Sequence, residues 1–342
     1  MSPSPVRLAA LIVTHNRREK LELCLAHTLA QGFDRVLVID NASDDGTAAW
    51  LARQDDPRLE VLRLAENGGG AGGFAAGLAR LAGPGASRPD SQPDSQPDWI
   101  ALFDDDAWPG PGAVAAFRAR ADGLDPDCAG PGAIAALGAA VLTPAGRPAE
   151  LNRPALNPFW HIGTLLRSLA GGGREGFHLH EGDYAPEAPE RAVDALSFVG
   201  FFLARGAVAR AGLPDAGLFI YGDDTIYSLT LRRAGLGLRF CPAIRFVHDC
   251  GHALAPRPIW KVYYLCRNGV RMARAAAGPW LFALALGWYL LAWTRKARLY
   301  PPAERRLYRR MMRAGLRDGL RGRGGANPAI HRMALEATAE SR

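Results

Sequence analysis

The chain has 342 residues, of which 48% are hydrophobic and 22% are charged, and its formal net charge is +7. These values are ordinary for a globular protein and argue against global disorder, and the length allows one large or two medium domains. The five cysteines form no CxxC pair, which suits a reducing compartment. The first residues do not have the pattern of a leader, so we expect no signal peptide.

The positive charge is concentrated toward the C-terminus. Residues 257–323 contain 16 Lys and Arg against two acidic residues, whereas residues 1–256 carry a net charge of −7. The basic segment therefore predicts contact with a polyanion such as a membrane surface or a nucleic acid.

Strand-like and helix-like patterns alternate along the first part of the chain. Buried strands are expected at residues 7–14, 35–39 and 59–64, and helices at residues 16–29, 48–54 and 74–81. The first helix has a capping-box pattern formed by Asn16 and Glu19. A repeat, PDSQPDSQPD, predicts a low-complexity insertion loop at residues 83–98. This alternation predicts an α/β fold with a mostly parallel, mixed sheet flanked by helices.

The next expected strand, residues 99–104, ends on three consecutive carboxylates, Asp104, Asp105 and Asp106. Adjacent negative charges at a strand end are costly without a compensating cation. Mg²⁺ and Mn²⁺ favour carboxylate oxygens and bind through one or two of them together with substrate phosphates. Since ligands bind at the carboxyl ends of strands in open α/β sheets, the triplet predicts a metal–diphosphate site. A solvated acidic turn is the alternative.

Two further polar motifs lie in the second half. Before them, residues 113–121 predict a helix, residues 134–142 a strand, and residues 151–191 a variable loop region over the site.

The first motif is Asp223-Asp224, which precedes an expected helix at residues 225–234. One interpretation is that these residues simply cap the N-terminus of that helix. Expected strands at residues 238–241 and 244–247 lead to His248, which could be a structural histidine or a metal ligand.

The order of these motifs resembles the inverting glycosyltransferases of the family-2 type, which have a GT-A nucleotide-diphospho-sugar transferase fold. The resemblance covers residues 8–249. The sequences Glu66-Asn67-Gly68-Gly69, Phe103-Asp104-Asp105-Asp106 and Gly222-Asp223-Asp224 look most like the galactofuranosyltransferase branch, with rhamnosyltransferases as close relatives. The resemblance implies a catalytic domain at residues 1–256.

The resemblance also implies a metal site and a donor site. Asp104, Asp106 and His248 would bind Mn²⁺ or Mg²⁺ on the diphosphate of the donor, and the metal would neutralise the departing nucleoside diphosphate. The glycines that follow Asn67 would let the backbone approach the donor closely. The expected donor-binding residues are Thr14, Arg17, Asp40, Asn67, Gly68 and Asp105.

The reaction implied by the resemblance is an inverting sugar transfer. Asp224 would act as the general base on the acceptor hydroxyl, and Asp223 would bind the acceptor. The expected donor is UDP-galactofuranose, with dTDP-rhamnose as the alternative. The acceptor would be a saccharide or a polyprenyl-linked saccharide in cell-envelope polysaccharide assembly.

Residues 257–323 predict a helical, membrane-associating extension. Residues 275–294 contain no charge and include three tryptophans, but Gly278-Pro279 interrupts them and both flanks are basic. This pattern predicts an interfacial or re-entrant anchor on anionic lipid at the cytoplasmic face of the membrane, with a buried soluble helix as the alternative. Arg267 is expected to meet phosphate or to form a surface salt bridge. Residues 324–342 predict a disordered tail.

Three other classes of function fit the sequence less well. A nucleotidyltransferase would need a glycine-rich basic loop directly after the first strand, whereas Thr14-His15-Asn16-Arg17 stands there. A nucleic-acid binder would present a periodic basic face, but here the basic residues interleave with an apolar run, so we expect no nucleic-acid partner. A scaffold without transferase activity remains open.

Overall fold

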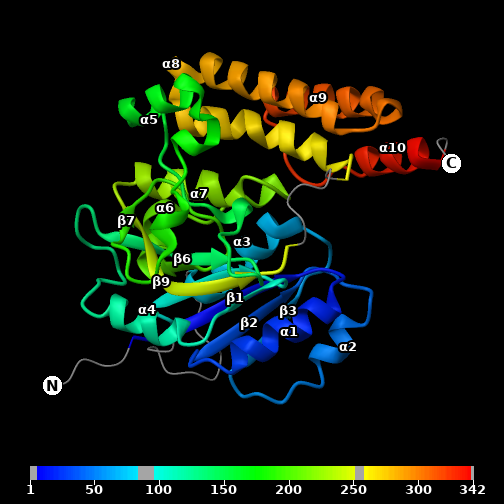
Figure 1. The fold of residues 1–342 in the computed structure, drawn as a ribbon. Coiled ribbons are helices and arrows are strands. Elements are labelled where there is room, and N and C mark those ends of the chain that lie inside the picture. The colour runs from blue at the N-terminus through cyan, green and yellow to red at the C-terminus, as the bar shows by residue number, and fades with distance from the viewer. Residues whose placement is uncertain (1–5, 84–95, 251–257, 340–342) are drawn as a thin grey trace.

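The computed structural model describes residues 6–83, 96–250 and 258–339. Figure 1 shows one mixed β-sheet with helices on both faces and a helical layer stacked beyond one of them. Most of the insertion expected at residues 83–98 lies outside the described residues. The sheet order is β3-β2-β1-β4-β8-β6-β9-β5, with β7 pairing on β9.

The first half of the sheet is parallel and, apart from the edge strand β3, almost fully buried. Its strands are β1 (Leu8–Thr14), β2 (Arg35–Asp40), β3 (Leu59–Arg63) and β4 (Trp99–Asp104). β1 lies between β2 and β4, and all seven of its residues are buried. Continuous apolar strands of this kind are typical of a parallel sheet covered on both faces. The parallel order also brings the carboxyl ends of β1, β2 and β4 to one edge.

The second half of the sheet is mainly antiparallel. It contains β5 (Ala107–Pro109), β6 (Ile134–Leu142), β7 (Arg191–Ala192), β8 (Phe201–Ala204) and β9 (Gly237–His248). The two strands expected at residues 238–241 and 244–247 are one strand, β9, whose pairing with β6 shifts register between Ala139 and Ala140. Because β5 pairs antiparallel with β9, Ala107 lies opposite His248.

Helices cover both faces of the sheet (Figure 1). One face carries α1 (Arg18–Leu29), α2 (Thr47–Leu51) and α4 (Ala113–Ala121). The other carries α3 (Gly69–Ala82), α6 (Arg205–Ala211) and α7 (Asp223–Arg233), and α5 (Ile162–Arg167) lies farther out. The capping box expected for α1 is wrong: its N-cap is Arg17 and makes no side-chain cap hydrogen bond.

The C-terminal extension is a compact helical layer with its own apolar core. It contains α8 (Lys261–Lys296), α9 (Arg305–Leu320) and α10 (Pro328–Ala339). Gly278, with φ of +64°, turns α8 back on itself, so that Trp293 packs directly against Gly269. The tail expected to be disordered instead contains α10, which buries Ile330 and Ala334 in this core. The segment is ordered because these two apolar side chains pack against the core of the extension.

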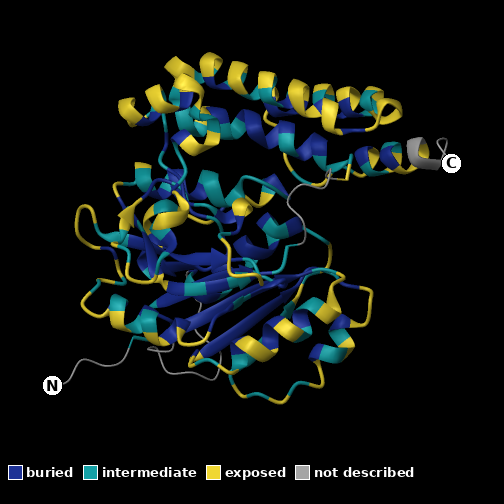
Figure 2. Cartoon of the chain, in the orientation of Figure 1, coloured by how far each residue is buried: buried dark blue, intermediate teal, exposed yellow. Residues whose placement is uncertain are grey.

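Figure 2 shows the buried sheet in dark blue and the outward face of the extension largely exposed. The first segment of α8 buries Val262, Tyr263 and Tyr264 against its neighbours, whereas Trp280, just after the turn, is 94% exposed. The extension therefore has one face that packs inward and one apolar face without cover among the described residues.

Glycines in α3 allow this helix to lie close to β1. A Cβ atom at Gly77 would lie 2.2 Å from Cδ1 of Leu11, and one at Gly73 would lie 2.4 Å from Cγ1 of Val13. Both contacts are far shorter than van der Waals distance, so larger residues would force α3 away from the sheet.

We therefore expect Gly77→Ala to destabilise the protein by about 1–3 kcal/mol, because the added methyl group overpacks a fully buried contact. Gly72→Ala is the matched control on the same helix, since a Cβ there meets nothing within 4 Å. It should be neutral or stabilising by up to about 1 kcal/mol through helix propensity. Urea unfolding of both variants measures this, and equal losses would contradict the packing argument.

Candidate active site

The carboxyl ends of three neighbouring strands place polar side chains at one edge of the sheet. Thr14 at the end of β1 pairs with Asp40 at the end of β2, and Val13 pairs with Asp104 at the end of β4. Asp105 and Asp106 follow in the turn to β5 and are buried. The strand order thus gathers the acidic triplet and two of the expected donor-binding residues at one place.

Asp105 and Asp106 are partly neutralised by residues of the first βα turn. The hydroxyl of Thr14 donates to Oδ2 of Asp105 at 2.8 Å. Nη1 of Arg17 lies 3.1 Å from Oδ1 of Asp105 and 2.7 Å from Oδ2 of Asp106. Both oxygens of Asp105 therefore have partners. Arg17 is 52% exposed at its side chain, so it can also reach a ligand from this position.

Asp104, Asp106 and His248 form a group that could hold a divalent metal ion. One ligand atom from each lies within 4.8 Å of the others. Burial and the neighbouring charge of Asp106 raise the pKa of Asp104 to about 7. A divalent cation would offset this cost, and two carboxylates with an imidazole are a suitable donor set. The sequence placed these three residues together correctly.

His248 is held from both sides of its ring. Nε2 lies 3.1 Å from Oδ1 of Asp106, and Nδ1 lies 2.7 Å from Oδ1 of Asn152. Burial would lower the pKa of His248, but the hydrogen bond to Asp106, the interaction with Cys250 and the charges of Asp106 and Asp104 together outweigh burial and raise the pKa to about 10. Because an amide oxygen only accepts, Nδ1 carries a proton and Nε2 is directed at the acidic group.

Asn152 is a site residue that the sequence analysis missed. It lies 96 residues before His248 in a segment without periodicity, and its own Nδ2 donates to the hydroxyl of Ser197 at 3.0 Å. No local pattern in the sequence signals such a contact. A polar residue that orients a metal-binding histidine is found only when the fold brings the two together.

Asp223 and Asp224 begin α7 and are half-buried. Burial and the charge of Asp224 raise the pKa of Asp223 to about 8, and the charge of Asp104 contributes as well. Burial also raises the pKa of Asp224, although the Thr225 N–H donates to its Oδ1 at 2.6 Å. Because the charge of Asp104 helps to raise the pKa of Asp223, the two acidic groups lie near enough to each other to interact electrostatically.

Asp40, Asn67 and Gly68 lie on the side of β1 that is opposite to β4 and the acidic triplet. Asp40 is fully buried; Oδ1 accepts the Ser43 N–H at 2.9 Å, and Nε of Arg63 lies 3.5 Å from Oδ2, which has no hydrogen-bond partner. The Gly68 N–H donates to Oδ1 of Asn41 at 2.9 Å, and Oδ1 of Asn67 accepts the Gly69 N–H at 2.8 Å.

The glycines that follow Asn67, which were expected to let the backbone approach the donor, mostly serve the packing of the protein itself. They form the start of α3, and those at positions 69, 73 and 77 make room for other parts of the protein. A Cβ at Gly69 would lie 2.0 Å from the carbonyl oxygen of Phe219, in the loop before α7. Gly70 and Gly72 have nothing within 4 Å of a Cβ position, so open space remains only beside these two.

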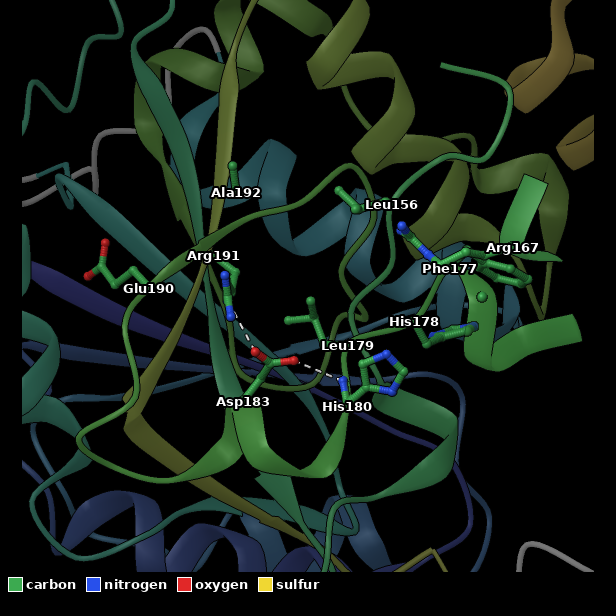
Figure 3. A pocket seen from close by; sticks show the side chains of 11 residues that line it. Leu156, Arg167, Phe177, His178, Leu179, His180, Asp183, Glu190, Arg191 and Ala192 are labelled. Atoms are coloured by element: carbon green, nitrogen blue, oxygen red, sulfur yellow. Dashed lines mark hydrogen bonds and ion pairs between the residues drawn. The ribbon is translucent and has the colours of Figure 1, made fainter. Parts of the chain in front are cut away.

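Residues 151–191 do not form a single loop over the site. Asn152 reaches His248, but the later part builds a separate cavity of about 460 Å³ beside β7 (Figure 3). There Asp183 accepts from Nε of Arg191 and from the His180 backbone N–H. None of the expected site residues lines this cavity.

The comparisons with known proteins agree with this architecture. Residues 9–147 match the family model described as "Glycosyl transferase family 2". Galactofuranosyltransferase GlfT1 of Mycolicibacterium smegmatis is 27% identical over 302 residues, which is 83% of this chain and 89% of the relative. GlfT1 of Mycobacterium tuberculosis is 26% identical over 311 residues, or 84% of this chain and 89% of the relative.

Two solved structures resemble the fold. S. aureus TarS residues 1–349 gives a TM-score of 0.54 at 12% identity, covering 92% of this chain and 81% of that one. GalNAc-T7 with UDP, GalNAc and Mn²⁺ gives a TM-score of 0.51 at 14% identity, covering 87% and 58%. At such identities the likeness concerns the fold alone, and it confirms the expected GT-A-like architecture.

The charge on Asp223 leads to a prediction about stability. Because its folded-state pKa lies above its unfolded value, ionising Asp223 destabilises the folded state, and the cost grows as the pH rises from about 4 through about 8. With divalent metal chelated, Asp223→Asn should equal the wild type in Tm at pH 3.5 and exceed it by at least about 2 °C at pH 8.

A matched control should show the opposite sign. The hydrogen bond from Arg58 lowers the pKa of Asp56, so its carboxylate stabilises the folded state above pH 4. Asp56→Asn should therefore lose Tm as the pH rises. Thermal unfolding between pH 3.5 and 8 measures both variants, and a flat difference for Asp223→Asn would show that this carboxyl carries no penalty.

Proposed function

We propose that this chain, a glycosyltransferase with a family 2 domain, is a metal-dependent, inverting galactofuranosyltransferase. The observation that carries the proposal is the proximity of two acidic groups. Asp104, Asp106 and His248 lie within ligand distance of one another, and Asp223, next to Asp224, is close enough for its pKa to respond to the charge of Asp104. A diphosphate donor and an acceptor hydroxyl need these two groups at one centre.

The donor half of the site would be formed by the ends of β1, β2 and β4. Bound Mn²⁺ or Mg²⁺ would supply positive charge at the diphosphate and so make it a better leaving group. Arg17, which sits at the start of α1, would exchange part of its contact with Asp106 for a phosphate oxygen. Thr14 holds Asp105, which would contact the donor ribose or sugar. Asp40 would bind the nucleoside.

The acceptor half would be formed by the start of α7. Asp224 would take the proton from the acceptor hydroxyl while its oxygen attacks the anomeric carbon from the face opposite the diphosphate. The raised pKa of Asp224 makes it a stronger base than an ordinary carboxylate. Asp223 would hold the acceptor. One base and one leaving group on opposite faces give inversion.

The identity of the donor rests on the relatives. Both GlfT1 proteins are named galactofuranosyltransferases and match most of this chain. UDP-galactofuranose is therefore our proposed donor and dTDP-rhamnose the alternative. The acceptor would be a saccharide or polyprenyl-linked saccharide used in cell-envelope polysaccharide assembly.

We further propose that the enzyme binds the cytoplasmic face of the membrane through its helical extension. Among the described residues, the helix Lys261–Leu299 is long and apolar enough to cross a membrane, and only 6% of its most apolar window is buried. The turn at Gly278 instead folds the second segment of α8 onto the first. That geometry favours an interfacial position over a straight span.

Two segments contribute to the exposed apolar surface. The second segment of α8 exposes Trp280, Leu284 and Trp288, and α5 exposes Ile162 and Leu166. α5 lies beside the turn of α8 (Figure 1), where Nδ2 of Asn157 donates to the Ala276 carbonyl at 2.9 Å. α9 adds a stripe of exposed arginines at helical spacing, Arg306, Arg310, Arg313 and Arg317, suited to anionic headgroups.

The transferase proposal predicts metal-dependent donor binding. A ligand that binds only the folded state raises Tm. UDP with Mn²⁺ should raise the Tm of the wild type by several degrees, UDP alone should do so much less, and the double variant Asp104→Ala/Asp106→Ala should not respond. Thermal scans with UDP, dTDP and GDP measure this. If no diphosphate stabilises the wild type with metal, the proposal fails.

Asp224→Asn is the matched variant for chemistry. It should keep the UDP–Mn²⁺ stabilisation but lose transfer from UDP-galactofuranose to octyl rhamnoside and octyl galactofuranoside probes by about 10²–10⁴-fold, because only the base is removed. Retained transfer would exclude Asp224 as the base. Loss of both binding and transfer would assign it a structural role.

Membrane binding is predicted to depend on both the tryptophans and the arginines. Trp280→Ser/Trp288→Ser should lower flotation with anionic vesicles at least about tenfold. Arg306→Gln/Arg310→Gln/Arg313→Gln should lower it about 100-fold, since each basic residue contributes about 1 kcal/mol at an anionic surface. Leu335→Ser, at an exposed position on α10, is the control. Equal flotation of all variants would contradict the proposal.

A further inference from the structure

The loop before α7 has an unusual backbone. Phe219 has φ of +62° and Tyr221 has φ of +70°, although neither is a glycine, and Gly222 follows with φ of +80°. Non-glycine residues in this region persist only where the surroundings determine the conformation. Asp223 and Asp224 come directly after the loop, so its path sets where their carboxyl groups lie.

Asn268, on α8, binds this loop through its amide group. Nδ2 lies 2.8 Å from the Leu218 carbonyl oxygen, 2.7 Å from that of Ile220 and 2.8 Å from that of Tyr221. Asn268 is almost fully buried. One amide nitrogen thus serves three carbonyls of the loop, one of which, that of Leu218, also accepts the Ile220 N–H at 2.7 Å.

Arg267 supports the same loop from its other end. Nη2 donates to the carbonyl oxygens of Gly217 and Leu218 at 3.2 and 2.8 Å, and Nε donates to Oδ1 of Asn268 at 2.9 Å. The side chain is fully buried, and its guanidinium group stacks on the rings of Tyr263 and Tyr264. The expected phosphate contact or surface salt bridge is therefore wrong for Arg267.

The opposite side of the loop rests on the start of α3. The Ala71 N–H donates to the Phe219 carbonyl oxygen at 3.1 Å, and Gly69 lies so close to that oxygen that any side chain would clash. The loop is therefore held between α3, which begins at the expected donor site, and α8, which belongs to the extension.

We propose that Arg267 and Asn268 are positioning residues for sugar transfer: they hold residues 217–222 in the strained path that sets Asp223 and Asp224 opposite the metal-binding group. This inference rests on the proposed function. It makes the helical extension a part of the active site rather than only a docking segment. It also assigns a task to a buried arginine that has no carboxylate partner among the described residues.

Asn268→Ala and Asn268→Asp test the proposal together. Aspartate keeps the shape and the acceptor for Arg267 but replaces the donating amide with an oxygen that repels three carbonyls. Both variants should lower kcat with UDP-galactofuranose and the octyl glycoside probes by about 10²-fold, while the donor KM and the UDP–Mn²⁺ stabilisation change by less than about threefold. Amide exchange in residues 218–224 should accelerate at least tenfold.

Tyr308→Phe is the matched control. It removes another buried hydrogen bond of the extension, from the Tyr308 hydroxyl to the Trp293 carbonyl at 2.7 Å, but does not touch the loop. It should lower Tm without changing kcat or loop exchange. Arg267→Lys, which keeps the charge but loses the forked contacts, should fall between Tyr308→Phe and Asn268→Ala.

Two outcomes would overturn the proposal. Asn268→Asp could retain wild-type kcat and loop exchange, or Asn268→Ala could lose no more kcat than Tyr308→Phe at a similar loss of Tm. Failure of the proposed function reads differently. In that case the wild type transfers no sugar and does not respond to UDP with Mn²⁺, whereas the exchange measurement still reports whether the pair holds the loop.

Discussion

The repulsion among five carboxylates that share one partly buried edge is the constraint on which this site depends. Asp104, Asp105 and Asp106 follow β4, and Asp223 and Asp224 approach them from α7. The chain offsets only part of that charge, through Arg17, Thr14 and His248. Burial, together with the charge that is not offset, raises the pKa values of Asp104 and Asp223. Carboxyl groups with perturbed pKa values are found mainly at functional sites. Here a metal ion that carries a diphosphate would supply the positive charge that offsets them.

The local sequence was sufficient to predict the strand ends and the residues that follow them. β1, β2 and β4 are continuous apolar runs, so their boundaries and the polar residues after them could be read directly, and parallel order then placed Thr14, Asp40 and Asp104 together. His248 and the Asp223–Asp224 pair were predicted from their order along the chain. Strand geometry therefore accounts for the placement of Thr14, Asp40 and Asp104, whereas the roles of His248, Asp223 and Asp224 stay predictions from the resemblance.

The contacts that it missed are long-range and depend on packing. Asn152 meets His248 across 96 residues, and Asn268 meets the loop before α7 across about 50. Gly69, Gly73 and Gly77 each mark a close approach of α3 to a second element, and the sequence of the helix does not indicate what that element is. α10 has no strong signal of its own and is stabilised by the apolar core that α8 and α9 form. Local patterns contain no information about these partners.

The two halves of the site differ in how they are built. The residues that would hold metal and donor mostly lie within residues 9–147, the region that matches the family model, and they stand on buried central strands. His248, Asp223 and Asp224 lie beyond that region, and Asp224, the proposed base, comes shortly after a strained loop between α3 and α8. Because the loop contacts α3 through Phe219 and α8 through Asn268, a change in the extension can alter the acceptor side while the strand-borne donor side stays in place.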